Sequence, residues 1–316
     1  MTQLKKLWLI IPCYNEEEAL PLTLPIMKEK MSDLISRGKI DPDSHILLVN
    51  DGSKDRTWEL IQKYHEDKLV YGVNLSRNKG HQNALLAGLY TAKDYCDFTI
   101  TMDCDLQDDI HAIDKMVDEY LEGFDVVYGV RSSRQTDTAF KRVTAETYYK
   151  VLEHMGAQII YNHADFRLLS KRALEALMQY KEVNLFLRGL VPMVGYPSTT
   201  VEYERKERMA GESKYPLHKM LSFAFEGITS LSTKPIQWIS RLGLGVFLIS
   251  IFMLIYSVVQ YFRGKTVAGW ASIITSIWAI GGLILLSIGV IGEYIGKNYL
   301  ESKERPRFII QEKLID

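Results

Sequence analysis

Short apolar runs and helical patterns alternate along roughly the first 130 residues. The apolar runs have the length of β-strands and cover residues 7–11, 46–49, 70–75, 98–102 and 126–128. Helical patterns lie between them, from Asn15 toward Ile35 and then over residues 54–64, 79–93 and 111–121. Asn15 is expected to cap the first helix and to place Glu16 in its first turn. This alternation predicts an α/β domain with a largely parallel sheet, whose ligands bind beyond the carboxyl ends of the strands.

Two much longer apolar stretches follow. Residues 242–262 and 266–292 contain no charged side chain, and only residues 263–265 separate them. About 20 apolar residues suffice for a helix to cross the hydrocarbon core of a membrane. The pattern therefore predicts a transmembrane hairpin with both ends on one side. The alternative is a pair of buried core helices, although such long uncharged runs are rare in soluble domains.

Basic residues orient this hairpin. Four precede the first stretch and four follow the second: Lys214, Lys219, Lys234, Arg241, Lys297, Lys303, Arg305 and Arg307. The connecting loop holds only Arg263 and Lys265. Because basic residues accumulate on the cytoplasmic side, the large N-terminal domain and both termini are expected in the cytoplasm of a multi-pass cell-membrane protein.

The segment before the hairpin and the tail after it have patterns of their own. Apolar residues repeat at helical spacing in Leu217, Met220, Leu221, Ala224, Phe225, Ile228 and Leu231. We expect an amphipathic helix at the membrane surface there, a core helix being the alternative. The expected division is a catalytic domain in 1–212, the interfacial helix in 213–235, two transmembrane helices in 236–296 and a tail in 297–316. The strand-like run in 305–311 has two open partners, the catalytic domain or a neighbouring subunit.

Composition narrows the class of protein. The formal net charge is -1, so no general basic field favours nucleic acid as a partner. The three cysteines, Cys13, Cys96 and Cys104, fit no zinc-binding spacing and cannot all pair, which predicts reduced structural thiols.

The strongest chemical signal is an acidic cluster after the predicted strand 98–102. It comprises Asp103, Asp105, Gln107, Asp108 and Asp109. Crowded carboxylates repel one another unless a cation lies among them, and Mg²⁺ commonly combines one or two carboxylates with phosphate oxygens of a substrate. The alternative is a solvated turn, in which Asp108 and Asp109 cap the following helix. Two further polar clusters, PCYNEE and NDGSKDRT, follow the first two predicted strands, so three such turns share one rim of the sheet.

The order of these motifs carries a resemblance to a known family. The sequence reads PCYNE, NDGSKD, SRNKGHQNALLAG, DCDLQDD and then RMAGESKY. It resembles family-2 glycosyltransferases with the GT-A fold, and among them the polyprenyl-phosphate glycosyltransferases, such as bactoprenol glucosyl- and N-acetylglucosaminyltransferases and dolichol-phosphate mannose synthases. The resemblance covers the whole chain, including the hairpin and GEYIGKNY after it.

The resemblance implies roles for individual residues. The nucleotide-sugar site would include Pro12, Tyr14, Asn15, Glu16, Asp51, Arg77, Gly80 and Asp103, with Asp51 at the uracil edge. The family often has Asp where this chain has Asn50, and Ala where it has Cys104. The resemblance also implies Mg²⁺ or Mn²⁺ bound by Asp103, Asp105 and Gln107. Asp105 and Asp165 would be catalytic, Asp165 as a base or as an orienting residue.

The acceptor of the sugar would be a lipid monophosphate, and an anionic acceptor of this kind needs cationic side chains to bind it. The candidates for binding its phosphate are Arg131, Arg134, Arg167, Arg205, Arg208 and Lys214. The resemblance implies that Ser213 and Lys214 contact either the acceptor phosphate or the donor diphosphate. For any single arginine the alternative is an ordinary surface ion pair.

The expected reaction is inverting transfer of a sugar from a nucleotide diphosphate, UDP-N-acetylglucosamine or UDP-glucose, to undecaprenyl phosphate. The product would be a lipid-linked sugar for cell-envelope glycans. A flippase and an extracytoplasmic glycosyltransferase would then use it. Membrane lipid and a second copy of the chain are further expected partners. One alternative is a processive polysaccharide synthase, although Gln237, Trp238 and Arg241 stand in the wrong order for its motif. A non-catalytic adaptor that binds a nucleotide sugar is another, which the presence of Asp103 and Asp105 disfavours.

Overall fold

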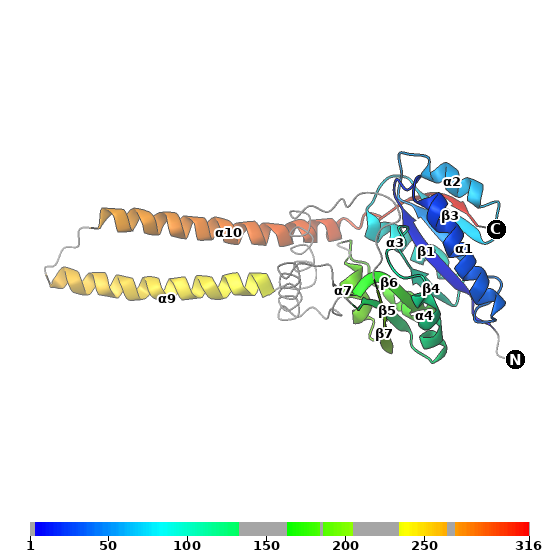
Figure 1. The fold of residues 1–316 in the computed structure, drawn as a ribbon. Helices are drawn as coiled ribbons and strands as arrows, with labels where there is room; N and C mark the ends of the chain where they lie inside the picture. Colours follow the sequence, from blue (N-terminus) through cyan, green and yellow to red (C-terminus); the bar gives the residue numbers. More distant parts are fainter. Residues whose placement is uncertain (1–3, 133–162, 184–185, 205–233, 264–268, 316) are drawn as a thin grey trace.

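The computed structural model describes residues 4–132, 163–183, 186–204, 234–263 and 269–315 (Figure 1). Several predictions lie outside these residues: the boundary at residue 212, the amphipathic helix, and the acceptor ligands Arg134, Arg205, Arg208, Ser213 and Lys214.

A mixed sheet forms the centre of the globular part. Its strand order is β7-β5-β6-β4-β1-β2-β3-β8. The strands are β1 (Leu7–Cys13), β2 (His45–Asn50), β3 (Val70–Leu75), β4 (Phe98–Thr101), β5 (Val126–Arg131), β6 (His163–Ser170), β7 (Ser198–Tyr203) and β8 (Ile310–Leu314). Strands β1 to β4 are parallel to one another, and β6 lies antiparallel between β4 and β5. The predicted parallel-rich α/β sheet is therefore confirmed for β1 to β4.

Helices cover both faces of the sheet. They are α1 (Leu20–Ser36), α2 (Thr57–Tyr64), α3 (His81–Ala92), α4 (Ala112–Leu121), α6 (Lys171–Leu177) and α7 (Leu187–Met193). Alternate residues of β1 face opposite cores: Leu9 packs with α1, α2 and α4, whereas Ile10 packs with α3, α6 and α7. Because both faces are covered, the central strands read as continuous apolar runs in the sequence.

The start of α1 differs from the prediction. The helix begins at Leu20, and Asn15 lies in the preceding loop with a left-handed backbone, φ 53°. The side-chain oxygen of Asn15 accepts the N–H of Lys54 at 2.9 Å, and its own N–H donates to Ser53 Oγ at 3.0 Å. The expectation that Asn15 caps a helix was wrong, because its hydrogen bonds join two loops that are distant in sequence.

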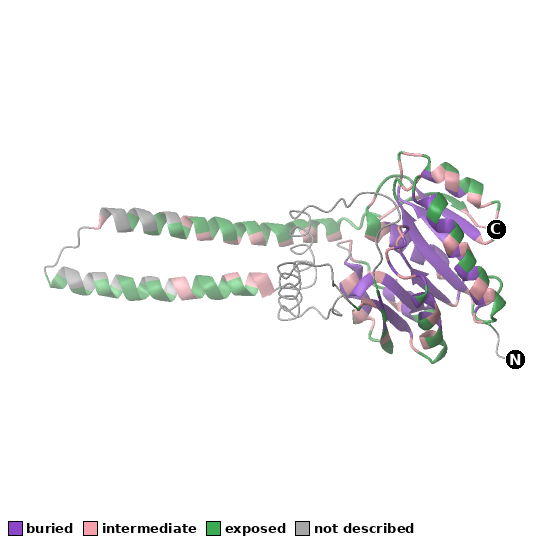
Figure 2. Cartoon of the chain, in the orientation of Figure 1, coloured by how far each residue is buried: buried purple, intermediate pink, exposed green. Residues whose placement is uncertain are grey.

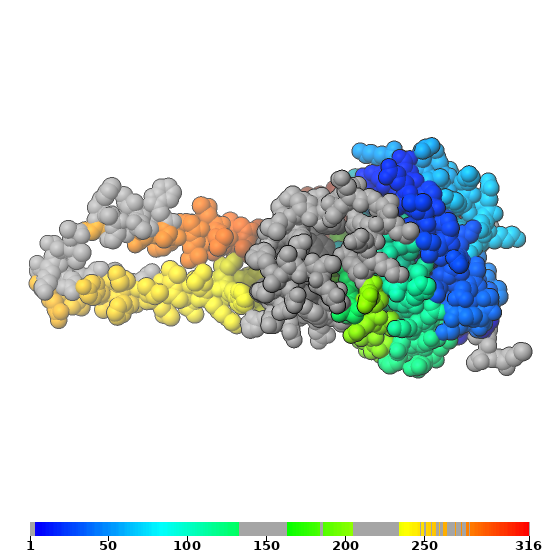
Figure 3. All heavy atoms as spheres, in the orientation of Figure 1, coloured from blue at the N-terminus to red at the C-terminus, as the bar shows by residue number. Residues whose placement is uncertain are grey.

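Two long helices, α9 (Lys234–Phe262) and α10 (Trp270–Ser302), project side by side from the globular part (Figures 1 and 3). Figure 2 shows that the described residues of both are mostly exposed, whereas buried residues concentrate in the sheet. By length and composition, Lys234–Met253 and Ala279–Ser302 are candidate membrane spans, and neither is buried inside the protein. They agree with the predicted hairpin on these two criteria.

The tail after α10 returns to the sheet. Strand β8 pairs antiparallel with β3, so the N-terminal sheet domain, and not a neighbouring subunit, is the partner observed for the tail. Strand β8 begins at Ile310, later than the predicted run. Two further contacts join this end of the chain to the domain. Glu301 accepts the N–H of Val183 at 2.8 Å, and Arg307 donates to the carbonyl of Tyr180 at 2.7 Å.

Candidate active site

The loop after β2 supports the loop before α3. Asp51 is only 2% exposed, and its two carboxylate oxygens accept the N–H groups of Lys79 and Gly80 at 2.7 and 2.9 Å. Burial raises the pKa of this carboxyl, and the two backbone donors oppose the rise. Gly52 has φ +62°, and a Cβ there would lie 2.4 Å from the carbonyl carbon of Arg77. Asp51 thus holds the loop in place, while its contact with uracil stays a prediction.

The loop after β1 lies against the loop before α2. Glu16 donates its N–H to Thr57 Oγ1 at 2.9 Å, and Glu17 donates its N–H to Asp55 at 3.1 Å. Pro12 is buried at the end of β1, whereas the Tyr14 side chain is exposed. The predicted nucleotide-sugar residues of β1 and β2 therefore meet at one rim of the sheet.

The acidic cluster separates into two parts. Asp103 and Asp105 are partly exposed after β4, and Asp105 accepts the N–H of Gln107 at 3.1 Å. Asp108 is buried instead, and it accepts hydrogen bonds from the Tyr203 hydroxyl and from Arg131, the latter at 3.3 Å. The alternative role of Asp108 as a helix cap was wrong, because its carboxylate joins β5 and β7.

Asp109 does not cap α4 either, because His111 is the capping residue and no side chain caps this helix. Its carboxylate accepts the N–H of His111 at 3.4 Å, just before α4 begins. The acids beside the strand end are therefore Asp103 and Asp105.

The acids at the end of β4 provide a set of oxygen donors for a metal ion. Within the described residues, no three His, Cys, Asp or Glu side chains converge as a metal-binding group. Two carboxylates nevertheless suit Mg²⁺, which takes one or two of them and completes its shell with water and substrate phosphate. Burial raises the pKa of Asp103, and the carboxylates of Asp108, Asp165 and Asp105 raise it further, against the opposing effect of His81. A bound cation would favour the charged form of Asp103, so the donor set fits a hard cation.

Asp165, on β6, is the centre of a cluster of cations. Arg167 donates to one carboxylate oxygen, and Arg188 contacts both, at 3.4 and 3.0 Å. Burial alone would raise the pKa of Asp165, but Arg188, His81 and Arg167 outweigh it and hold the pKa well below its ordinary value. Asp165 is therefore ionised at neutral pH.

His81, the first residue of α3, connects this cluster to the acidic strand end. Its Nε2 lies 3.5 Å from Asp103 Oδ1 and 3.7 Å from Asp165 Oδ2. Burial lowers the pKa of His81, but the two carboxylates outweigh it and raise the pKa to about 9. The histidine is therefore protonated at neutral pH, and it places the two predicted acid sites next to each other.

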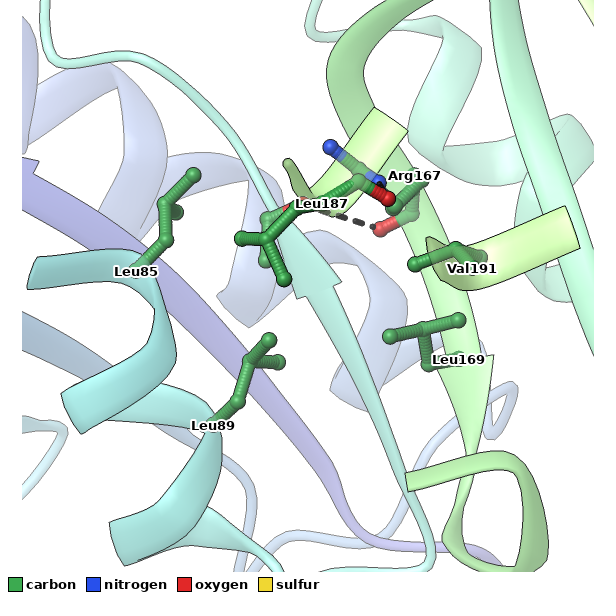
Figure 4. Close-up of a pocket in the computed structure, with 7 residues that line it drawn as sticks. Leu85, Leu89, Arg167, Leu169, Leu187 and Val191 are labelled. Atoms are coloured by element: carbon green, nitrogen blue, oxygen red, sulfur yellow. Dashed lines mark hydrogen bonds between the residues drawn. The ribbon is translucent and has the colours of Figure 1, made fainter. Parts of the chain in front are cut away.

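Two of the predicted acceptor ligands have acidic partners within the fold. Arg131 contacts Asp108, and Arg167, 2% exposed, contacts Asp165 and the carbonyl of Leu187. Figure 4 shows Arg167 above a small recess between α3, β6 and α7, lined mainly by leucine and valine. The recess has no room for a water molecule, so it is packed core and not a ligand site.

Sequence reasoning missed His81 and Arg188. His81 stands within SRNKGHQNALLAG, a motif used only for the resemblance, and Arg188 stands in the apolar segment LFLRGLV. A charged residue within an apolar helical pattern was the available signal for Arg188, since a partly buried charge favours a charged partner.

Comparison with known proteins identifies the family. The model of glycosyl transferase family 2 matches residues 8–178. Together, the mixed sheet, its acidic strand end and this match define the class, and the chain belongs to glycosyl transferase family 2.

Relatives match along almost the whole chain. An uncharacterized glycosyltransferase of Bacillus subtilis (strain 168), YkoT, is 53% identical, with 96% of this chain and 90% of the relative covered. The bactoprenol glucosyl transferase of Shigella phage SfV is 40% identical, with 97% and 98% covered. Among solved structures, glucosyl-3-phosphoglycerate synthase of Mycobacterium tuberculosis is 16% identical and overlaps 72% of this chain and 78% of its own, with a TM-score of 0.48.

Proposed function

We propose that this chain transfers a sugar from a UDP-sugar, UDP-N-acetylglucosamine or UDP-glucose, to undecaprenyl phosphate, with inversion at the anomeric carbon. The observation that carries the proposal is the similarity to a bactoprenol glucosyl transferase over 97% of this chain and 98% of that relative. The described apolar helices support it, because a lipid acceptor requires access to a membrane.

On the donor side, the loops after β1 and β2 would bind the nucleotide through Pro12, Tyr14, Asn15, Glu16, Asp51, Arg77 and Gly80. Asp103, Asp105 and Gln107 would hold Mg²⁺ or Mn²⁺. When bound, the cation would neutralise charge that develops on the departing diphosphate. These roles are those expected of a GT-A domain, which binds a nucleotide sugar.

On the acceptor side, a phosphate oxygen attacks the anomeric carbon while the bond from that carbon to the diphosphate breaks, and UDP leaves with the electron pair. A phosphate monoester has a second pKa of about 6, so it is largely dianionic at neutral pH and needs no base. The low pKa of Asp165 also makes it a poor proton acceptor. We therefore assign Asp165 an orienting role. Arg131 stays a proposed acceptor ligand, with Arg134, Arg208, Ser213 and Lys214 of the undescribed segments.

The proposed arrangement places α9 and α10 across the cell membrane, with the catalytic domain and both termini in the cytoplasm. Residues 213–235 would lie at the membrane surface between the catalytic domain and the hairpin. The lipid-linked product would then need a flippase and an extracytoplasmic glycosyltransferase that uses it.

The test is a transfer assay with purified full-length protein, radiolabelled UDP-sugars, undecaprenyl phosphate and Mg²⁺ or Mn²⁺. We expect organic-soluble, acid-labile label. Asp105→Asn should lower the rate by about a hundredfold or more, in the range found when an electrostatic contact to the transition state is removed. Asp109→Asn, a neighbouring acid outside the proposed metal set, should retain the rate. Full activity of Asp105→Asn would refute the assigned role, and long water-soluble polymer would indicate a polysaccharide synthase.

A further inference from the structure

Arg188, the second residue of α7, is the accessible cation beside Asp165. Its Nε and Nη2 atoms contact the two carboxylate oxygens at 3.4 and 3.0 Å. Its side chain is 32% exposed, whereas Arg167, which binds the same carboxylate, is 2% exposed. Of the two guanidinium groups on Asp165, the one on Arg188 therefore reaches the surface of the site.

The backbone just before Arg188 is held by two other elements. The N–H of Leu187 donates to Gln82 Oε1 at 2.8 Å, and the Leu187 carbonyl accepts from Arg167 Nη1 at 3.3 Å (Figure 4). Gln82 belongs to α3 and Arg167 to β6. Because α3 and β6 both fix Leu187, the guanidinium that follows is positioned before any ligand arrives.

Arg188 also lies close to the acidic strand end. Asp165 contacts Arg188 on one side and His81 on the other, and His81 is within 3.5 Å of Asp103. A continuous series of side chains thus runs from α7 to the carboxylates that follow β4. Two side chains, Asp165 and His81, therefore connect Arg188 to Asp103.

The charges in this cluster favour an anion. Arginine is always charged and has five N–H donors, and Nε and Nη2 of Arg188 contact Asp165. Two guanidinium groups share the single negative charge of Asp165. The planar fork of arginine matches a phosphate group through two parallel hydrogen bonds. Arg188 differs from Arg167 in being 32% exposed, so it can reach a ligand at the surface of the site.

We propose that Arg188 binds a phosphate group of a substrate, and that Asp165, Arg167 and Gln82 are its positioning residues. The inference rests on the proposed function and makes it more specific, since both substrates of that reaction carry phosphate. The donor diphosphate and the acceptor monophosphate present the same oxygen chemistry, so the test must separate them.

The experiment measures binding without turnover. Full-length protein in detergent is titrated calorimetrically with UDP plus Mg²⁺ and, separately, with farnesyl phosphate as a short polyprenyl monophosphate. Arg188→Ala should weaken one of these ligands by about tenfold to a hundredfold, the range for a charged hydrogen bond. Arg188→Lys should weaken it less, because the charge remains while the fork is lost. Arg172→Ala is the matched control, since Arg172 also pairs with a carboxylate, that of Asp125, away from the site.

Each outcome decides the proposal. Weaker binding of UDP alone assigns Arg188 to the donor diphosphate, and weaker binding of farnesyl phosphate alone assigns it to the acceptor. Unchanged affinity for both ligands in a folded Arg188 variant, checked by thermal unfolding, overturns the proposal, as does a wild-type protein that binds neither ligand.

Gln82→Ala should weaken binding of the same ligand by a smaller factor. A merely structural Gln82 would lower thermal stability without changing affinity. Failure of the wild type in the transfer assay would refute the proposed function and leave this binding test intact.

Discussion

The sheet domain and the α9–α10 hairpin use apolar residues in opposite ways. In the sheet, Leu9 and Ile10 are fully buried between helices, whereas Leu285 in α10 is 72% exposed. Charges show the reverse distribution. Asp165 and Arg167 lie inside the domain, and residues 242–262 of the hairpin carry no charge. The domain supplies partners for its own buried groups, while the hairpin requires an apolar partner outside the chain, which we propose is lipid.

This difference leads to opposite expectations for the same kind of substitution. Removing a charged group inside the domain should lower the free energy of unfolding. Adding a charged group to the hairpin should make membrane insertion less favourable. The substitutions that follow test this contrast, beginning with the largest expected effect.

Removing the carboxylate of Asp165 should have the largest effect on stability. Asp165→Asn leaves the buried guanidinium of Arg167 without its counter-charge. Breaking a buried pair in this way typically costs about 3–5 kcal/mol. Denaturant unfolding, followed by tryptophan fluorescence, should show that loss in the free energy of unfolding. Asp109→Asn, at a partly exposed acid, should change it by less than about 0.5 kcal/mol, and an equal effect of both substitutions would contradict the assignment.

Acid titration tests the same carboxylate in the wild-type protein. An aspartate in the unfolded chain has a pKa of about 3.9, and the pKa of Asp165 in the folded protein lies well below that value. The ionised carboxylate therefore stabilises the fold at pH values above the unfolded pKa. That stabilisation is lost as pH falls through the folded pKa. Stability at low pH should therefore converge between wild type and Asp165→Asn, and a difference that stays constant with pH would argue against an ionised Asp165.

Cavity formation compares the two regions at matched side chains. Leu48→Ala in β2 removes a fully buried side chain and should cost about 2–5 kcal/mol of unfolding free energy. Leu285→Ala in α10 leaves no cavity inside the protein and should cost far less in the same detergent titration. If both variants lost equal stability, the hairpin would have to pack against another part of the protein.

The same contrast explains what could be predicted from the sequence. Strands β1 to β4 were recognised because burial on both faces gives uninterrupted apolar runs, and α9 and α10 because their exposure to a proposed lipid phase excludes charge. Strand β6 was missed, since HADFRLLS places polar residues in the core.

Polar residues in the core escape sequence reasoning because their hydrogen-bond partners lie elsewhere in the chain. Arg167 is satisfied by Asp165 and by Leu187, and Asn15 by the loop after β2. Partners of this kind are brought together only by the tertiary fold, so no local pattern reveals them. The acidic strand end was identifiable because its residues are adjacent in the chain.

Adding a charge to the hairpin tests the proposed lipid contact. Leu285→Arg near the middle of α10 should raise the apparent free energy of membrane insertion of residues 270–302 by about 3–4 kcal/mol, because a favourable leucine is lost and an unfavourable arginine is gained. A glycosylation-mapping assay in microsomes would read this value. Leu121→Arg, at an exposed leucine that ends α4, should leave the unfolding free energy of the domain within about 0.5 kcal/mol. Unimpaired insertion of the Leu285→Arg segment would contradict a membrane-spanning α10.

The smallest effect is expected where the two regions meet. Arg307 follows α10 and donates to the carbonyl of Tyr180, so Arg307→Ala should cost only about 0.5–1.5 kcal/mol, the net value of one hydrogen bond. The loss should be local: amides of β8 should exchange faster with deuterated solvent while those of β1 do not change. Arg305→Ala replaces an exposed neighbour and is the matched control. Equal exchange in both variants would mean that pairing of β8 with β3 holds the tail without Arg307. Faster exchange in Arg307→Ala alone would show that a side-chain contact at this junction helps to fasten α10 to the catalytic sheet.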